Sequence, residues 1–319
     1  MTVATARAHP NIALVKYWGK ADAASNLPAT GSLSMTLDIF PTTTTVRIVD
    51  RDHDRVVFNG AEREGTVRDR VVRFLDHVRL LAGREDRAEV ITENTVPSAA
   101  GLASSASGFA ALAQAASTAY GLALDDRSLS RLARRGSGSA ARSVIPRFAV
   151  WHAGSDEQSF AEPVQAPPIE MVIATVDARE KAVSSRDAMQ RTAMTSPFYP
   201  AWVTSTAQTL ESALEACRSG DLERLGRITE TNALRMHAAI QGSDPSIRYL
   251  TPRSWAIFDA VAQLRGEGVL AWATADAGPN VCVISPPEHT AAVAERIGAL
   301  ADVVIARPGP GVRLQETDA

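Results

Sequence analysis

The sequence lacks several features that would assign a chain of 319 residues to a familiar class of protein. It has only two cysteines, Cys217 and Cys282, which lie far apart and belong to no Cys-x-x-Cys pair or His/Cys cluster. A disulfide framework and a structural zinc site are therefore not indicated. We expect both thiols to be buried, because free cysteine is among the most buried residue types.

Long apolar runs and an excess of charge of one sign are missing as well. No run approaches the roughly 20 apolar residues that span a bilayer, and the N-terminus shows no signal-peptide pattern, so we expect a cytoplasmic protein without a membrane partner. The net charge of −3 provides no basic surface for a nucleic-acid backbone. The common Gly-Lys-Ser/Thr phosphate loop is also absent. These absences favour small molecules as partners.

The composition that is present belongs to a globular protein of two domains. Hydrophobic residues make up 45% of the chain and charged residues 22%, which is ordinary for a folded protein, and the length exceeds that of one compact core. The composition changes near Pro167-Pro168, which predicts domains over 1–168 and 169–319. The mixture of strand and helix patterns indicates the α+β class, with helices over one face of a largely antiparallel sheet.

Apolar residues at a period of two predict strands, and those at a period near 3.6 predict helices. The expected strands cover 12–15, 32–38, 43–49, 88–94, 171–177, 269–274, 281–285 and 303–306. The expected helices cover 68–81, 109–120, 126–135, several segments up to 240, and 288–300. Val71, Leu75, Val78 and Leu81 are expected to face the core, with Gly83 as the C-cap of their helix.

Small residues join the strand that ends at Asn94 to the helix that follows. The segment 97–108 reads Pro-Ser-Ala-Ala-Gly-Leu-Ala-Ser-Ser-Ala-Ser-Gly, so the free N–H groups of a first helical turn are combined with Gly101 and three serine hydroxyls. This combination is suited to phosphate groups. The alternative is that the small residues only permit close packing of the helix.

Lys16 and Asp276 are polar residues at the ends of apolar strands. Lys16 directly follows the apolar residues 12–15, which indicates an anionic partner; the alternative is a lysine that extends to solvent from a sheet edge. Asp276 begins the group Asp-Ala-Gly-Pro-Asn at 276–280, and turn formation alone would explain it. If the second half folds over the first, its carboxylate meets Lys16 in a cleft between domains, where small-molecule sites are common.

A second group of glycines and serines lies at 135–143, which reads Arg-Gly-Ser-Gly-Ser-Ala-Ala-Arg-Ser. Backbone N–H groups and hydroxyls can surround an oxyanion while Arg142 binds it with two parallel hydrogen bonds. A flexible basic turn is the alternative. His9 and His237 belong to no cluster, and we interpret both as packing or rim residues.

Together these segments resemble the diphosphomevalonate decarboxylases, a family of the GHMP kinase superfamily. The similarity extends from about residue 8 to 313, and its motifs are Asn-Ile-Ala-Leu-Val-Lys-Tyr-Trp-Gly-Lys at 11–20, the segments 97–108 and 135–143, Val-Ser-Ser-Arg at 183–186, and 276–280. The resemblance implies an N-terminal α/β domain with a phosphate-binding strand–turn–helix and a C-terminal ferredoxin-like α+β sandwich. It also implies a homodimer.

The reaction that the resemblance implies belongs to isoprenoid biosynthesis by the mevalonate pathway. ATP and Mg²⁺ phosphorylate the 3-hydroxyl of mevalonate 5-diphosphate, and loss of phosphate and carbon dioxide gives isopentenyl diphosphate. Positioning and charge neutralisation are the main tasks of the protein in such a reaction.

The resemblance also assigns roles to individual residues. Asp276 would orient or deprotonate the 3-hydroxyl, Lys16 would neutralise the transferred phosphoryl group, and Arg142 would hold the substrate carboxylate or diphosphate. The implied substrate-binding residues are Tyr17, Lys20, Ser137, Gly138, Ser139, Arg142, Ser184 and Ser185. The implied ATP-binding residues are Asn94, Pro97, Ala100, Gly101, Leu102, Ala103, Ser104, Ser105 and Ser107, with Ser105 also contacting the metal.

Two positions depart from the family pattern. Pro146-Arg147 replace two glycines, and Thr30-Gly31 replace a turn that contains asparagine. These changes affect loop geometry and substrate affinity, not a charged catalytic group.

Two other functions stay open. The alternatives are a related kinase or decarboxylase that acts on mevalonate or its monophosphate, and a nucleotide-binding protein without catalysis.

Overall fold

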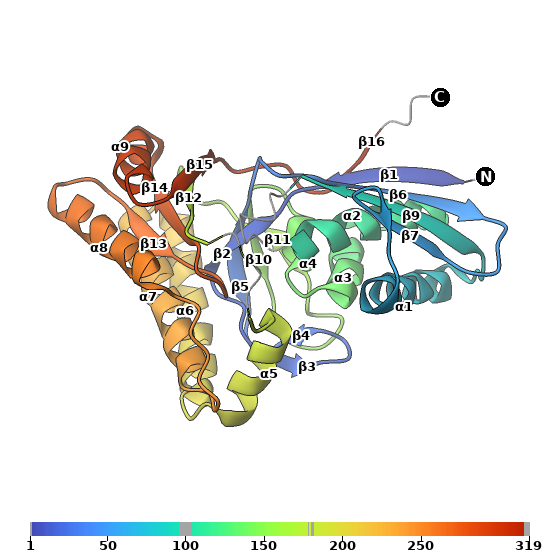
Figure 1. The fold of residues 1–319 in the computed structure, drawn as a ribbon, viewed down its shortest axis with the longest axis horizontal. Helices are drawn as coiled ribbons and strands as arrows, with labels where there is room; N and C mark the ends of the chain where they lie inside the picture. Colours follow the sequence, from blue (N-terminus) through green and yellow to red (C-terminus); the bar gives the residue numbers. More distant parts are fainter. Residues whose placement is uncertain (1, 96–103, 178, 180–181, 316–319) are drawn as a thin grey trace.

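The computed structural model describes residues 2–95, 104–177, 179 and 182–315. Figure 1 shows an elongated molecule of two halves, with α5 between them. The strands of the first half are β1 (Val3–Ala8), β2 (Asn11–Val15), β3 (Lys20–Asp22), β4 (Leu27–Pro28), β5 (Ser32–Thr36), β6 (Thr42–Val49), β7 (Arg55–Phe58), β8 (Ala61–Glu62), β9 (Arg87–Asn94), β10 (Phe148–Trp151) and β11 (Ala161–Pro163). Its helices are α1 (Gly65–Ala82), α2 (Ser104–Ala119), α3 (Asp126–Gly136) and α4 (Ala140–Ser143).

The second half begins with β12 (Glu170–Thr175) and contains most of the helical residues. Its other strands are β13 (Trp272–Thr274), β14 (Val281–Ser285), β15 (Asp302–Ala306) and β16 (Arg313–Gln315). Its helices are α5 (Ser185–Thr195), α6 (Tyr199–Ser219), α7 (Leu222–Gln241), α8 (Pro252–Gly266) and α9 (Pro287–Gly298). No described helix is long and apolar enough to cross a membrane.

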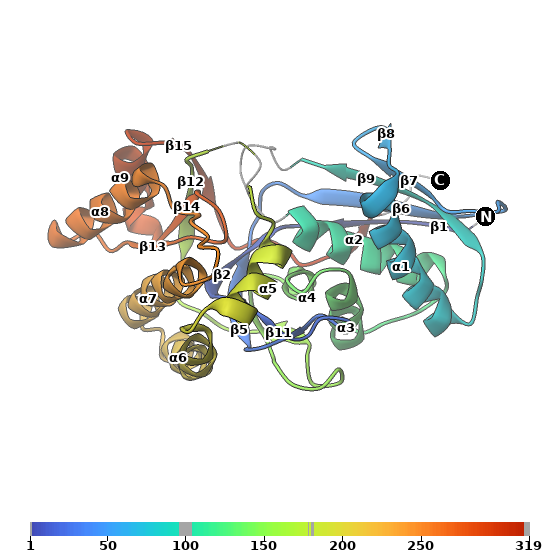
Figure 2. The ribbon, with the colours of Figure 1, turned by 60° about the horizontal axis from the view of Figure 1, so that its bottom comes forward.

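A six-stranded sheet in the order β16-β1-β6-β9-β7-β8 supports the first half. Its pairs are antiparallel except β7 with β9. Helix α2 packs against β1 and β6, as the turned view in Figure 2 also shows. Alanines such as Ala110 and Ala113 are fully buried in this contact, and their small side chains let the helix approach the sheet closely. The sheet therefore fixes where the N-terminus of α2 lies.

A second sheet joins the two halves of the molecule. It has the order β11-β10-β5-β2, and β2 and β5 are buried along their whole length. Leu33 and Met35 of β5 share one hydrophobic core with Leu210 of α6, Leu225 of α7 and Ile173 of β12. Because this core crosses from one half to the other, the end of β2 lies directly against the second half.

The third sheet, β13-β14-β12-β15, is antiparallel throughout. Val172 and Val283 pack against α8 and α9, whereas Ile173 and Ile284 on the other face pack into the core with α6 and α7. The expectation that helices cover one face of this sheet is therefore wrong, since both faces are covered. The four consecutive buried residues of β12 are typical of a strand enclosed on both sides.

Helix α1 shows one correction to the expected core. Gly83 ends this helix with a φ of 61°, as expected for a C-cap glycine, and Leu75 and Val78 are buried. Leu81, however, is 59% exposed, and Phe74 is the fully buried large residue instead. Spacing alone placed the apolar stripe one turn too far toward the end of the helix.

Strand β16 returns from the second half to the first sheet. Its residues pair antiparallel with β1, for example Leu314 with Ala6, and the two strands lie at the same end of the molecule in Figure 1. Neither β16 nor helix α8 was expected from the sequence. Cys217 and Cys282 are both buried and free, as expected.

Candidate active site

Lys16 and Asp276 meet where the two halves join. The Lys16 side chain is 1% exposed, and its ammonium donates to Asp276 Oδ1 at 2.6 Å and to the carbonyl of Ala13 at 2.8 Å. Asp276 follows β13 in the loop before β14, and its side chain is 42% exposed. The expected contact between the amine of the first half and the acid of the second is therefore present.

Helix α7 supports both partners from behind. The Oδ1 of Asn232 accepts the backbone N–H of Lys16 at 2.7 Å, which fixes the residue at the exact end of β2. The ring of His237 lies 3.3 Å from the carbonyl of Ala275. Burial, with the nearby Lys16 charge, lowers the pKa of His237 to about 4. A neutral imidazole that donates from Nε2 to this carbonyl thus braces the residue before Asp276.

Arg142 is a buried cation without a carboxylate bonded to it. It lies in α4 and is 3% exposed. Its Nε donates to Asn11 Oδ1 at 3.1 Å and its Nη1 to Ser32 Oγ at 2.6 Å; within the described part of the chain it forms no ion pair. Burial lowers its pKa to about 10, and the negative charge of Asp276 partly opposes this. A guanidinium in this setting requires an anion.

Gly138 permits close contact between the serine loop, residues 137–139, and the aromatic wall of the site. A Cβ atom at Gly138 would lie 2.8 Å from Tyr17 Oη and 3.0 Å from Trp151 Cη2. The Tyr17 and Trp151 rings meet edge to face with centroids 4.8 Å apart. Any larger residue at 138 would displace one of these rings.

Three serine hydroxyls gather between the serine loop and the first turn of α2. Ser137 Oγ lies 3.3 Å from Ser105 Oγ and 3.5 Å from Ser139 Oγ. The first turn of α2 has free N–H groups and the positive end of the helix dipole. Hydroxyls from the two segments that the sequence predicted to bind anions, 97–108 and 135–143, therefore lie next to each other.

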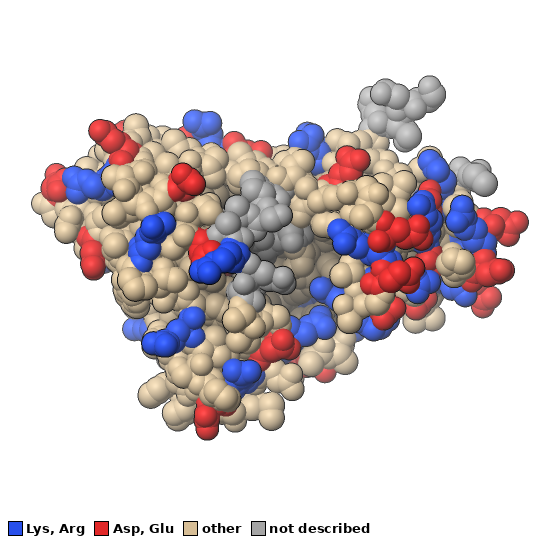
Figure 3. All heavy atoms as spheres, viewed as in Figure 1, with Lys and Arg blue, Asp and Glu red and all other residues tan. Residues whose placement is uncertain are grey.

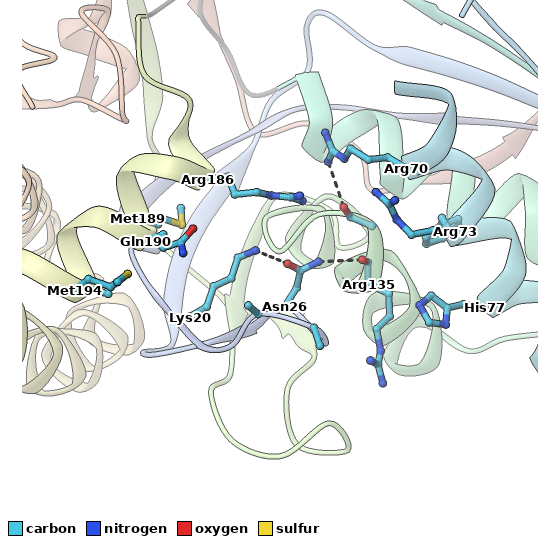
Figure 4. Close-up of a pocket in the computed structure, with 15 residues that line it drawn as sticks. Lys20, Asn26, Arg70, Arg73, His77, Arg135, Arg186, Met189, Gln190 and Met194 are labelled. Atoms are coloured by element: carbon cyan, nitrogen blue, oxygen red, sulfur yellow. Dashed lines mark hydrogen bonds between the residues drawn. The ribbon is translucent and has the colours of Figure 1, made fainter. Parts of the chain in front are cut away.

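A cavity of about 460 Å³ adjoins the serine loop and is lined by α1, α3, α5 and the turn after Lys20. Its cationic residues are Lys20, Arg70, Arg73, Arg135 and Arg186, and the described residues that line it include no Asp or Glu. In Figure 4, Arg186 extends toward Arg70 and Arg73 from the opposite wall. Figure 3 shows the surface hollowed between the two halves, with Lys and Arg side chains on both sides of the hollow.

This concentration of positive charge changes the acidity of its members. Burial, followed by the charges of Arg186 and Arg70, lowers the pKa of Lys20 to about 8. Burial and the charges of Arg186 and Arg73 also lower the pKa of Arg70. Cations that destabilise one another in this way are suited to a ligand with several negative charges.

The two halves of the chain match the models of two domains, both of which are named after the same enzyme. The diphosphomevalonate decarboxylase-like N-terminal domain matches residues 8–161, and the mevalonate 5-diphosphate decarboxylase C-terminal domain matches residues 171–304. The chain belongs to the diphosphomevalonate decarboxylase family. The resemblance read from the motifs is thereby confirmed, and the members of this family are enzymes.

Relatives of the family are similar over almost the whole chain. A diphosphomevalonate decarboxylase of Ganoderma lucidum is 35% identical over 92% of this chain and 81% of its own length. A phosphomevalonate decarboxylase of Haloferax volcanii is 32% identical over 92% of this chain and 91% of its own.

Solved structures of the family confirm the two-domain α+β fold. The mevalonate diphosphate decarboxylase from Staphylococcus aureus is 38% identical, covers 99% of this chain and 98% of its own, and has a TM-score of 0.95. A structure named "MDDEF in complex with MVAPP, AMPPCP and Magnesium" is 43% identical, covers 99% of both chains and has a TM-score of 0.94.

The other residues that the family resemblance assigned to ligand binding lie at the ends of helices and strands or in the core. Ser184 is the N-cap of α5, where its hydroxyl accepts the N–H of Asp187 at 3.2 Å, and Ser185 is the first residue of that helix. Ser107 is fully buried, and its hydroxyl bonds to Thr42 of β6 at 2.7 Å. Asn94 ends β9. Residues outside the described part are Pro97, Ala100, Gly101, Leu102 and Ala103, together with the side chain of Ser104.

Several polar residues at this site had no role in the expectations from the sequence. Asn11 and Ser32 hold Arg142, and Arg70 and Arg186 line the cationic cavity. Asn11 and Arg186 stood inside the quoted motifs, and the polarity of Asn11 beside the apolar residues 12–15 was a usable signal. Arg70 looks in the sequence like one of many exposed helix cations, and only its position beside α3 distinguishes it.

Proposed function

We propose that this protein catalyses the ATP-dependent decarboxylation of mevalonate 5-diphosphate to isopentenyl diphosphate, with ADP, phosphate and carbon dioxide as the other products. The observation that carries the proposal is Arg142, a buried guanidinium that is hydrogen-bonded only to neutral groups and lies within the field of the Asp276 carboxylate. A substrate with a carboxylate, a tertiary alcohol and a diphosphate complements Arg142, the pair of Lys16 and Asp276, and the cationic cavity.

Asp276 is our candidate for the general base. Its carboxylate is held by Lys16 through Oδ1, and its partial exposure leaves it accessible to a hydroxyl. It would accept the proton of the 3-hydroxyl as that oxygen attacks the terminal phosphoryl group. The ammonium of Lys16 would stabilise the negative charge that develops beside it.

The diphosphate of the substrate would lie in the cationic cavity. Lys20, Arg70 and Arg186 provide positive charge from three elements, and the serine loop with Tyr17 provides hydroxyl donors. We assign Arg142 to the substrate carboxylate, because a fork of parallel N–H groups matches a carboxylate. The hydrogen bonds that Arg142 donates to the neutral acceptors Asn11 and Ser32 would keep this fork fixed while carbon dioxide leaves.

The described residues fit ATP better than they fit a metal held by protein alone. Ser105 in the first turn of α2 lies 3.3 Å from Ser137, so a helix N-terminus and two hydroxyls are available for phosphate oxygens. The described residues contain no group of three His, Cys, Asp or Glu side chains that would hold a metal ion. Mg²⁺ would therefore be bound mainly through nucleotide phosphates, with Ser105 as its protein ligand. ATP would supply the phosphoryl group that makes the tertiary oxygen a leaving group, and Mg²⁺ would neutralise charge on the phosphates.

The experiment that tests the proposal uses the purified protein with Mg-ATP and each of three substrates. Mevalonate, its 5-phosphate and its 5-diphosphate are supplied in turn, and ADP, phosphate and carbon dioxide are measured. We expect kcat/KM for the 5-diphosphate to exceed that for the 5-phosphate by at least about 100-fold, because the 5-phosphate lacks the terminal phosphate and the charge-assisted contacts that this group would make. Release of ADP without carbon dioxide would refute decarboxylation.

The relative from Haloferax volcanii gives a second candidate, because its name is phosphomevalonate decarboxylase. The same assay decides this, since a preference for the 5-phosphate would assign that activity. The cationic cavity favours the diphosphate. A protein that binds ATP and turns over none of the three compounds would be a nucleotide-binding relative without catalysis.

We also propose that the protein is a cytoplasmic homodimer with domains over 1–168 and 169–319. The family resemblance supports the dimer. The gap between the matched domains, 162–170, supports the boundary. Light scattering of the purified protein would give the mass in solution, and a single-chain mass of 33.9 kDa would overturn the dimer.

A further inference from the structure

We propose that Asn26 is a positioning residue, which holds the ammonium of Lys20 in register with the serine loop. The inference rests on the proposed function, because Lys20 and the serine loop are assigned to the diphosphate. Nothing in the motifs of the sequence gave Asn26 a role. The geometry around its amide does.

The amide of Asn26 connects two segments that are more than a hundred residues apart. Its Oδ1 accepts a hydrogen bond from Lys20 Nζ at 2.6 Å. Its Nδ2 donates to the carbonyls of Arg134 and Arg135 at 3.1 and 2.9 Å. Both amide hydrogens and the oxygen are thus used, and a flipped amide would turn N–H groups toward an ammonium. Figure 4 shows Asn26 between Lys20 and the end of α3.

The two carbonyls that Asn26 binds belong to the last turn of α3. Such carbonyls have no partner inside a helix. Ser137 N–H donates to Ala133 O in the same turn, and Arg70 approaches Gly136 O at 3.4 Å. Asn26 therefore caps α3 from a distant turn, and the serine loop begins directly after the capped carbonyls. The direction in which residues 137–139 leave the helix depends on this cap.

The turn that carries Asn26 suits asparagine in both its backbone conformation and its side chain. Asn26 has a φ of 53° and is 6% exposed; asparagine tolerates this left-handed backbone better than most residues. Arg134 donates through Nη1 to the carbonyl of Ser25 at 2.7 Å and through Nη2 to Asp156. Glycine would accept the backbone conformation but would provide no amide.

Lys20 depends on Asn26 for its charge as well as its position. Arg186 of α5 and Arg70 of α1 disfavour the ammonium, and Asp22 on its own turn favours it. Arg73, His77 and Arg135 line the same cavity. Among the described residues Asn26 is the one hydrogen-bond acceptor of Lys20. Loss of its carbonyl oxygen would leave the ammonium buried among cations, and a carboxylate in its place would stabilise the ammonium.

Two variants separate this role from general support of the fold. Asn26→Gly keeps the left-handed turn and removes the amide. Asn26→Asp keeps the shape and the acceptor, adds a negative charge and removes both donors to α3. Ala21→Gly, at an exposed position beside Lys20, is the matched control for a looser backbone. Folding of each variant is checked by circular dichroism.

The first readout is the titration of Lys20, measured by the pH dependence of its acetylation with peptide mass spectrometry. We expect the pKa of Lys20 to fall by about 1 unit in Asn26→Gly and to rise by at least about 1 unit in Asn26→Asp, with no change in Ala21→Gly. A structural role alone would not move the pKa in opposite directions. Equal values in the native protein and both variants would overturn the proposal.

The second readout is steady-state turnover of mevalonate 5-diphosphate. Both variants lose the cap of α3, so we expect KM to rise at least about tenfold while kcat changes less than about threefold. A KM within about twofold of the native value in both variants would also overturn the positioning role. If the native protein releases no carbon dioxide, the proposed function fails, and the titration of Lys20 still decides whether Asn26 positions it.

Discussion

Lys16 Nζ lies 2.6 Å from Asp276 Oδ1, although 260 residues separate them in the sequence. The amine is enclosed and the acid is partly open, so the pair is asymmetric. The second hydrogen bond of Lys16, to Ala13, ties its ammonium to β2. Asp276 is therefore oriented by a fixed group and still has a surface for a substrate.

Replacement of Asp276 by asparagine tests its role as the base. The side chain keeps its size and an oxygen that accepts from Lys16, but it no longer takes a proton. We expect kcat to fall by about 10²- to 10⁴-fold and nucleotide affinity, measured by calorimetry, to change little. Asp259→Asn, at an exposed position of α8, is the matched control and should keep native kinetics. Native kcat in Asp276→Asn would contradict the assignment.

Arg142→Lys should lower kcat/KM by about 100-fold or more, because a lysine cannot replace a planar fork that binds Asn11, Ser32 and a carboxylate at once. Steady-state kinetics with mevalonate 5-diphosphate measure the loss. Arg147→Lys is the control at an exposed position. If the two variants have equal kinetics, Arg142 does not bind the substrate.

The stability of the protein should fall with acidification below pH 6.5 because of His237. Its pKa in the folded protein, about 4, lies below the ordinary value of 6.5, so the unfolded chain binds a proton first as the pH falls. Stability from the neutral ring is complete above pH 6.5 and is lost toward pH 4. We expect the protonation of His237 in the unfolded chain to lower the free energy of unfolding at pH 5 by about 2 kcal/mol relative to pH 7.

Urea denaturation at pH 7 and pH 5 measures this difference. The variant His237→Gln should be less stable at pH 7 but should show a smaller loss on acidification. His53→Gln, which replaces an exposed histidine, should keep the native loss. The idea fails if His237→Gln and the native protein lose the same free energy. His9, whose pKa burial also lowers to about 4, contributes a slope that both proteins retain.

Arg147→Gly should stabilise the protein. Arg147 has a φ of 60°, the left-handed conformation that costs an ordinary residue about 1 kcal/mol or more. Its backbone is fixed on both sides, because its N–H donates to Gly309 O and its carbonyl accepts from Thr36. We expect the free energy of unfolding to rise by up to about 1 kcal/mol, measured by urea denaturation. Arg147→Ala, which keeps the Cβ, should show no gain.

This position also explains one departure from the family pattern. The family resemblance implies two glycines where the sequence has Pro146-Arg147, and the backbone at 147 has a conformation that glycine adopts easily. The departure therefore changes the strain of this turn and leaves the chain path intact.

Local patterns were sufficient to predict the elements that carry the catalytic pair. The apolar residues 12–15 followed by Lys16 predicted a buried strand with a charge at its end, and β2 ends at Val15. The turn residues at 276–280 predicted the loop between β13 and β14. In both places the signal is a change from apolar to polar residues, which depends on neighbours in the sequence.

Contacts between distant segments could not be read in this way. The burial of Leu75 but not Leu81 depends on which part of α1 lies over the sheet. The cap of α3 by Asn26 depends on a turn a hundred residues earlier, and no spacing rule connects the two. The setting of Arg142 in α4 likewise depends on Asn11 of β2 and Ser32 of β5, which accept its hydrogen bonds.

The pairing of β16 with β1 makes the two halves unequal as independent pieces. A fragment that stops at residue 168 would leave the backbone groups of Ala6 and its neighbours unpaired along one edge, where Leu314 and Arg313 now bind. It would also uncover Leu33 and Met35, which the later helices shield. Such a fragment would expose both an unpaired strand edge and an apolar surface. The first half should therefore be prone to aggregation when it is expressed alone.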